Sequence, residues 1–213
     1  MNSRWILAAA TMGLLAASPI RAVQPTSEEM SRARDWSAAR FGDQEKAPSA
    51  DPPFSFVYDG KPSAGLLGTW KVERSSRKID GARTERVAAF TDPATGLVAT
   101  CRAVEYGDFP NVEWTLYFKN TGTADTPIIS DILALDASFA RPAGGEFILH
   151  SSKGDVCAAD SYEPLKEALG PGAARRFAPG GGRPTNGQYP YWNIETPDGC
   201  LIVFLWCRVI LLS

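Results

Sequence analysis

Histidine and clustered basic residues are scarce in this chain of 213 residues. It contains one histidine, His150, and four cysteines without Cys-x-x-Cys spacing, so we expect no zinc or other metal site. Lysine and arginine total 22 against 24 acidic residues, a formal net charge of -2, and no basic run of the kind that follows phosphates occurs. We therefore expect no nucleic-acid partner, because a phosphate backbone is bound by clustered positive charge.

Recognisable catalytic motifs are also lacking, and we predict no catalytic residue. Ser151 and Ser152 lack the Gly-x-Ser-x-Gly setting of a hydrolase nucleophile, and His150 beside them stands alone. No Lys-Ser/Thr follows the glycines at 180–182, so they do not form a phosphate loop and we expect no cofactor. Two carboxylate pairs, the nearest candidates for sugar hydrolysis, lie beside turns or at a strand edge, where a structural role is favoured: Glu105 with Asp108, and Asp131 with Asp136.

Residues 1–22 have the features of a secretory signal peptide. Arg4 precedes an apolar run from Trp5 to Ala17, and Ala22 is a small residue at the expected cleavage point. Cleavage removes two of the 22 basic residues, which leaves 20 against 24 acidic ones, a charge of -4. The prediction is a secreted or periplasmic bacterial protein that does not remain in the membrane.

Export leaves the state of the cysteines open. Outside the cytosol, Cys101, Cys157, Cys200 and Cys207 allow three disulfide pairings, among which the sequence does not choose. The alternative for Cys101 is a small buried residue, because it lies in an alternating strand pattern.

Residues 23–52 predict one short helix and a linker. Thr26 and Glu29 have the spacing of a capping box, apolar residues then recur near helical spacing to Phe41, and Gly42 is a plausible stop. The following segment, 43–53, is polar and contains proline, which is typical of a linker.

Residues 53–205 predict an all-β antiparallel domain. The clearest strand lies between Asn111 and Gly122, where Val112, Trp114, Leu116 and Phe118 alternate with polar residues. Similar short runs recur between turn signals with no helix between them, including one at 173–177, while 162–169 fits a helix or a strand. We expect two stacked antiparallel sheets, because one flat sheet does not accommodate so many strands.

An aromatic group follows the glycine-rich loop. For Tyr189, Tyr191 and Trp192, packing in the core is favoured, and stacking on a sugar ring is the alternative. Alternation along the strand places Trp192 on the opposite face from its two tyrosine neighbours, so one side of the group is buried and the other exposed.

Four separate segments resemble a known family in the expected order: Pro53 to Ser63, Thr91 to Leu97, Val104 to Gly122 and Gly181 to Gly187. They resemble the N-terminal domain of bacterial α-galactosidases of glycoside hydrolase family 36, and the likeness covers about 53–203. The resemblance implies an antiparallel β-supersandwich of the galactose-mutarotase-like type. It also implies that the two catalytic aspartates belong to a following TIM barrel, so no residue of this chain inherits either role.

The same resemblance implies where sugar contacts are to be sought. In some members of the family, aromatic residues of the N-terminal domain border the galactose pocket, which points to Trp70, Tyr189, Tyr191 and Trp192 as substrate-binding candidates. The expected ligand is an α-galactoside, and the expected protein partner is a catalytic domain or a second copy of the chain.

Residues 206–213 depart from the family pattern. The run from Leu201 to Leu212 is nearly all apolar apart from Arg208 and is short for a membrane span. The hypothesis from the sequence is a truncated or frame-shifted product, itself inactive. Two alternatives remain: a stand-alone secreted carbohydrate-binding protein, and an interaction domain whose apolar tail docks on a partner.

Overall fold

A computed structural model describes residues 23–42, 48, 51–139, 145–197, 199–204 and 210–212. The predicted signal peptide, most of the linker and part of the 206–213 segment lie outside the described residues. Among those that are described, no helix has the length and apolar character needed to span a bilayer.

Helix α1, Ser27–Phe41, is the helix predicted from the sequence. The Thr26 Oγ1 accepts a hydrogen bond from the Glu29 backbone N–H at 3.2 Å, and the Glu29 carboxylate accepts one from the Thr26 N–H at 2.7 Å. This reciprocal pair satisfies two donors that the first helical turn leaves free. The helix ends at Gly42, whose φ of 61° suits glycine, so the capping box and the stop are both confirmed.

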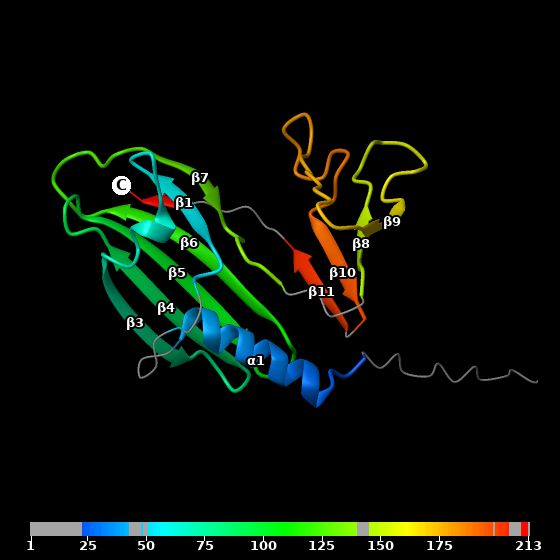
Figure 1. Cartoon of the computed structure of the whole chain (residues 1–213), viewed down its shortest axis with the longest axis horizontal. Coiled ribbons are helices and arrows are strands. Elements are labelled where there is room, and N and C mark those ends of the chain that lie inside the picture. The colour runs from blue at the N-terminus through cyan, green and yellow to red at the C-terminus, as the bar shows by residue number, and fades with distance from the viewer. Residues whose placement is uncertain are drawn as a thin grey trace, which may run out of the picture.

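The strands form three sheets, and the all-β class with one short N-terminal helix is confirmed (Figure 1). All strand pairs are antiparallel except β12 with β6, which are parallel. The first sheet has the order β2-β1-β7, with β1 Ser55–Tyr58, β2 Lys61–Pro62 and β7 Ile129–Leu133. The second has the order β12-β6-β5-β4-β3, with β3 Lys71–Lys78, β4 Arg83–Thr91, β5 Leu97–Tyr106, β6 Val112–Asn120 and β12 Ile210–Leu212. The third has the order β11-β10-β8-β9, with β8 Phe147–Ser152, β9 Pro164–Leu169, β10 Tyr191–Thr196 and β11 Gly199–Phe204.

The core lies between the β2-β1-β7 sheet and one face of the five-stranded sheet. Phe56 on β1 is 1% exposed and meets Phe118 on β6 edge to face, with 5.1 Å between ring centroids. Leu97, Ala99, Cys101 and Ala103 alternate along β5 and are all buried. Burial of these apolar side chains is the main stabilising term of this half of the molecule.

Helix α1 adds aromatic side chains to this core. Trp36 and Phe41 both pack on Trp114 of β6, with ring centroids 5.8 Å apart in each pair. The predicted alternation of β6 is therefore confirmed, because Trp114, Leu116 and Phe118 lie on the covered face while Glu113 and Lys119 are exposed.

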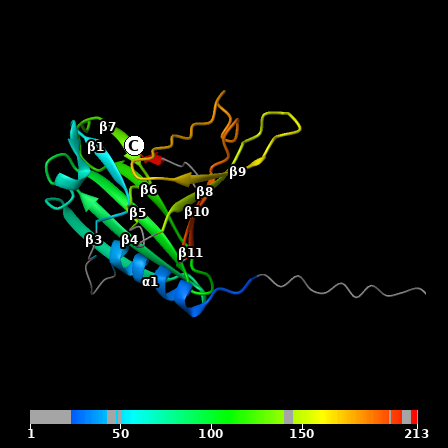
Figure 2. The same ribbon diagram turned by 45° about the vertical axis from the view of Figure 1, so that its right-hand side comes forward.

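The four-stranded sheet stands to one side of the five-stranded sheet in both views (Figures 1 and 2). The described strands form three sheets, of which two stack, so the expected number of two sheets is wrong. The predicted strand at 173–177 is also wrong: it is irregular chain, which places Phe177 against Trp192. The ambiguous 162–169 segment contains strand β9, because its backbone pairs with β8 from Phe147 to Ser152.

Candidate functional site

The β10 strand of the four-stranded sheet presents a row of side chains with sugar-binding chemistry. Tyr191, Asn193 and Glu195 lie on one face of the sheet, because side chains two residues apart in a strand point the same way. Tyr191 is 36% exposed, and the Glu195 side chain is 46% exposed. We call this surface the β10 face and define it by Tyr191, Asn193 and Glu195 with their cross-strand neighbours His150 and Lys166.

Strand β8, which neighbours β10, and strand β9, which neighbours β8, supply the basic groups of the β10 face. His150 on β8 is paired with Asn193 on one side and with Lys166 of β9 on the other. Its Nε2 lies 2.6 Å from Glu195 Oε2, and the Lys166 Nζ lies 3.9 Å from the same oxygen. The hydrogen bond from His150 and the nearby charge of Lys166 lower the pKa of Glu195.

Apolar side chains border the polar row on β11. Phe204 is directly opposite Tyr191 in the antiparallel register, and Ile202 is opposite Asn193. Phe204 and Ile202 are 50% and 56% exposed. The surface therefore changes from an apolar strip on β11 to a polar strip on β8 and β9, with β10 between them.

The other face of the same strand is covered. Trp192 packs on Phe177 with 5.4 Å between ring centroids, and Leu149 on β8 is buried. Trp192 thus contributes to packing while Tyr191 stays exposed, which is the arrangement that alternation allowed. The indole Nε1 of Trp192 is buried without a hydrogen-bond partner among the described residues.

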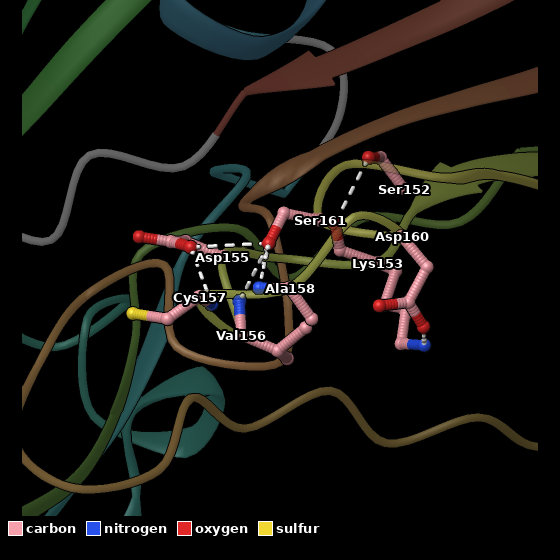
Figure 3. Close-up of polar contacts among 8 residues, drawn as sticks. All are labelled: Ser152, Lys153, Asp155, Val156, Cys157, Ala158, Asp160 and Ser161. Carbon is pink, nitrogen blue, oxygen red and sulfur yellow. Dashed lines mark hydrogen bonds and ion pairs between the residues drawn. The ribbon is translucent and has the colours of Figure 1, made fainter.

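The loop at 152–161, which follows β8, is held together by its own polar contacts (Figure 3). The Ser161 Oγ accepts hydrogen bonds from the backbone N–H groups of Val156 and Ala158, at 3.2 Å each, and donates to Asp155. Lys153 pairs with Asp160 in the same loop. The backbone of Asp155 in turn bonds to Thr185 and Gly187, so this loop is joined to the glycine-rich one.

Tyr189 lies at the junction of these loops and β10. Its ring meets Tyr162 edge to face, at 5.8 Å between centroids, and it is partly buried. Trp70 is elsewhere: it is 7% exposed and packs on Phe56 and Tyr58 in the main core. The structure therefore groups Tyr189, Tyr191 and Trp192 and separates Trp70 from them, and of the four only Tyr191 is an exposed residue.

The described cysteines and acidic residues form no metal centre. Cys101, Cys157 and Cys200 are free, and Cys207 is outside the described residues. Burial raises the pKa of the Cys101 thiol to about 12, which fits the alternative of a small buried residue. No group of three or more His, Cys, Asp and Glu with metal-site geometry occurs in the described part of the chain.

Sequence reasoning missed His150, Glu195 and Lys166 as members of one surface. His150 was interpreted as an isolated residue because its partner is 45 positions away along the chain. The alternating positions of Tyr191, Asn193 and Glu195 in the sequence indicate that these three side chains share one face of a strand. The register of β8 against β10 and of β9 against β8 has no such signal, because it depends on long loops between the strands.

Comparisons with known proteins identify no relative: no protein-family model, curated protein or solved structure matches this chain.

Proposed function

We propose that this protein is the non-catalytic N-terminal domain of a secreted α-galactosidase-like glycoside hydrolase, and that its β10 face contributes to carbohydrate recognition. The observation that carries the proposal is the alignment of an exposed aromatic ring, Tyr191, with Asn193 and Glu195 along one strand. The likeness of four segments to family 36 supplies the ligand class, an α-galactoside.

The chemistry of the β10 face suits a sugar. A pyranose has an apolar face of C–H groups and a rim of hydroxyls, so it matches an aromatic ring beside hydrogen-bonding side chains. Tyr191 offers the ring. Glu195, His150 and Lys166 supply donors and acceptors on neighbouring strands, whereas the Asn193 Oδ1 between them is buried without a hydrogen-bond partner among the described residues.

The acidic residues do not support hydrolysis by this chain. Glu105, 16% exposed, lies 3.5 Å from Arg86, whereas Asp108 is exposed in the turn that follows β5. Glu195 is engaged by His150 and Lys166. A retaining glycosidase needs two carboxyl groups flanking one bond, about 5–5.5 Å apart, whereas Glu195 is held by His150 and Lys166 and Glu105 by Arg86.

Two assays test the proposal. Titration of raffinose or galactose against the tryptophan fluorescence of the chain is expected to give a saturable change, because Trp192 lies directly behind Tyr191 in the strand. Incubation with a nitrophenyl α-galactoside is expected to release no nitrophenol. Absence of a saturable change contradicts carbohydrate recognition, and measurable turnover contradicts the non-catalytic role.

A second role is packing against a catalytic barrel, favoured by the exposed Ile202 and Phe204 beside Tyr191. Apolar strips of this kind are typical of contacts between domains. Mixing the chain with a separately produced α-galactosidase barrel tests it by size-exclusion chromatography. Co-elution that is lost in Ile202→Ser supports packing against the barrel. Separate elution of a chain that still binds raffinose supports the alternative of a stand-alone carbohydrate-binding protein.

A further inference from the structure

A second concave site lies in the other half of the molecule, between the end of α1, β1 and the covered face of the five-stranded sheet. Its volume is about 740 Å³, within the range of small-molecule sites. Its walls are largely apolar, and they include Phe41, Phe54, Leu67, Val72, Ala88 and Phe90. None of the β10-face residues lines this cavity, so an inference from it is independent of the proposed carbohydrate role.

Arg74 is the unusual member of the lining. It lies on β3, directly opposite Ala88 of β4, and so shares the covered face of the sheet with apolar residues. Its Nε is buried and has no hydrogen-bond partner among the described residues. A buried donor on a charged group that lacks an acceptor is costly, so an acceptor brought by a ligand stabilises the complex.

The other charged groups of the cavity do not neutralise Arg74. Asp51 and Asp136 line the cavity, but no ion pair joins either of them to Arg74 in the described structure. The Arg40 Nη1 donates to the backbone carbonyl of Asp51 at 2.8 Å. Cys101 also lines the wall, and its buried thiol is a small neutral group.

From this arrangement we propose that the cavity binds an amphiphilic monocarboxylate of the medium-chain fatty acid type. The carboxylate accepts hydrogen bonds from the Arg74 guanidinium, a charge-assisted contact that a planar fork makes well. The acyl chain lies against the phenylalanines and Val72. Asp51 and Asp136 also line the cavity, so a second acidic group on the ligand adds repulsion and a monoanion fits best.

The test uses the full chain and isothermal titration with decanoate below its critical micelle concentration and, separately, with decanol below its solubility limit. We expect decanoate to bind saturably and at least about tenfold more tightly than decanol, since only the carboxylate makes a charge-assisted hydrogen bond with the guanidinium. Arg74→Gln is expected to weaken the binding of decanoate by a similar factor and to leave the binding of decanol unchanged. Lys71→Gln, on the same strand but the opposite face, is the matched control and is expected to change neither.

Two further variants keep the test decisive if Arg74→Gln folds poorly. Arg74→Lys keeps the charge and loses the buried Nε, so it is expected to bind decanoate with intermediate affinity. Ala88→Leu adds volume inside the cavity and is expected to weaken both ligands. No saturable binding of decanoate, equal affinity for acid and alcohol, or equal loss in the Lys71→Gln control overturns the proposal.

Discussion

The imidazole Nε2 of His150 lies 2.6 Å from the carboxylate Oε2 of Glu195, across the pairing of β8 with β10. The two residues are 45 positions apart in the chain, so this contact depends on the sheet register and not on local sequence. It joins the middle of the β10 face to the neighbouring strand. Through this contact the ionised form of Glu195 contributes to the stability of the four-stranded sheet.

Replacement of Glu195 by Gln is expected to lower the urea midpoint at neutral pH. The pKa of Glu195 is lowered in the folded state, first by the His150 hydrogen bond and then by Lys166, so its ionised form favours folding. That contribution is complete above the pKa of the unfolded chain and is lost as the pH falls through the folded-state pKa. The midpoints of wild type and Glu195→Gln should therefore converge in acid.

The matched control is Glu146→Gln, at an exposed position just before β8. It is expected to leave the midpoint unchanged across the same pH range. A Glu195→Gln difference that grows as the pH falls would contradict the assigned sign.

Glu85 is expected to contribute to stability on the outer face of the five-stranded sheet. Its side chain is 8% exposed and accepts hydrogen bonds from Arg77 Nε at 2.6 Å and from Arg102 Nη2 at 2.5 Å. These hydrogen bonds lower the pKa of Glu85. Because both arginines are largely exposed, Glu85→Gln should cost only about 1–2 kcal/mol of unfolding free energy at neutral pH.

Denaturation of Glu85→Gln and of Glu73→Gln measures this effect. Glu73 pairs with Lys71 at an exposed position and is the control, for which little change is expected. The Glu85 effect should be full above the unfolded-state pKa and vanish as the pH falls through the lowered folded-state pKa. Equal effects of the two substitutions would exclude a special role for Glu85.

Gly154 holds the two loops beside β10 at close approach. A Cβ at this position lies 1.9 Å from the Thr185 carbonyl oxygen and 2.4 Å from the Gln188 backbone N. Gly154→Ala is therefore expected to displace the glycine-rich loop and to destabilise the protein by about 1–3 kcal/mol. Thermal denaturation checks this against Gly170→Ala, where a Cβ meets nothing within 4 Å; equal melting temperatures for the two variants would refute the packing argument.

Local features of this fold were predictable from sequence because their causes are local. The capping box at Thr26 and Glu29, the stop at Gly42 and the alternation of β5 and β6 follow from spacing alone. Cys101 was correctly placed among small buried residues as one of two alternatives, since its strand neighbours Ala99 and Ala103 share its face.

The features that sequence reasoning missed depend on pairing between distant segments. The described strands form three sheets where two were expected, because β1 pairs with β2 and with the distant β7 and does not join the β3 to β6 sheet. Trp70 was chosen as a sugar contact by family resemblance, yet its ring lies in the core against Phe56 and Tyr58. No sequence signal marks Arg74, whose Nε is buried without a hydrogen-bond partner among the described residues.

The most direct test of the carbohydrate role is a raffinose titration, followed by tryptophan fluorescence, on wild type, Tyr191→Ala and Phe109→Ala. Phe109 is also an exposed aromatic, 44% accessible, but it lies in the turn between β5 and β6, so it controls for loss of an exposed ring. Loss of stacking on Tyr191 is expected to weaken binding by about 1 kcal/mol, roughly fivefold, with Phe109→Ala unchanged. Saturable binding in wild type that weakens only in Tyr191→Ala is the predicted result, whereas no saturable change, or equal affinity in all three proteins, would contradict recognition at the β10 face.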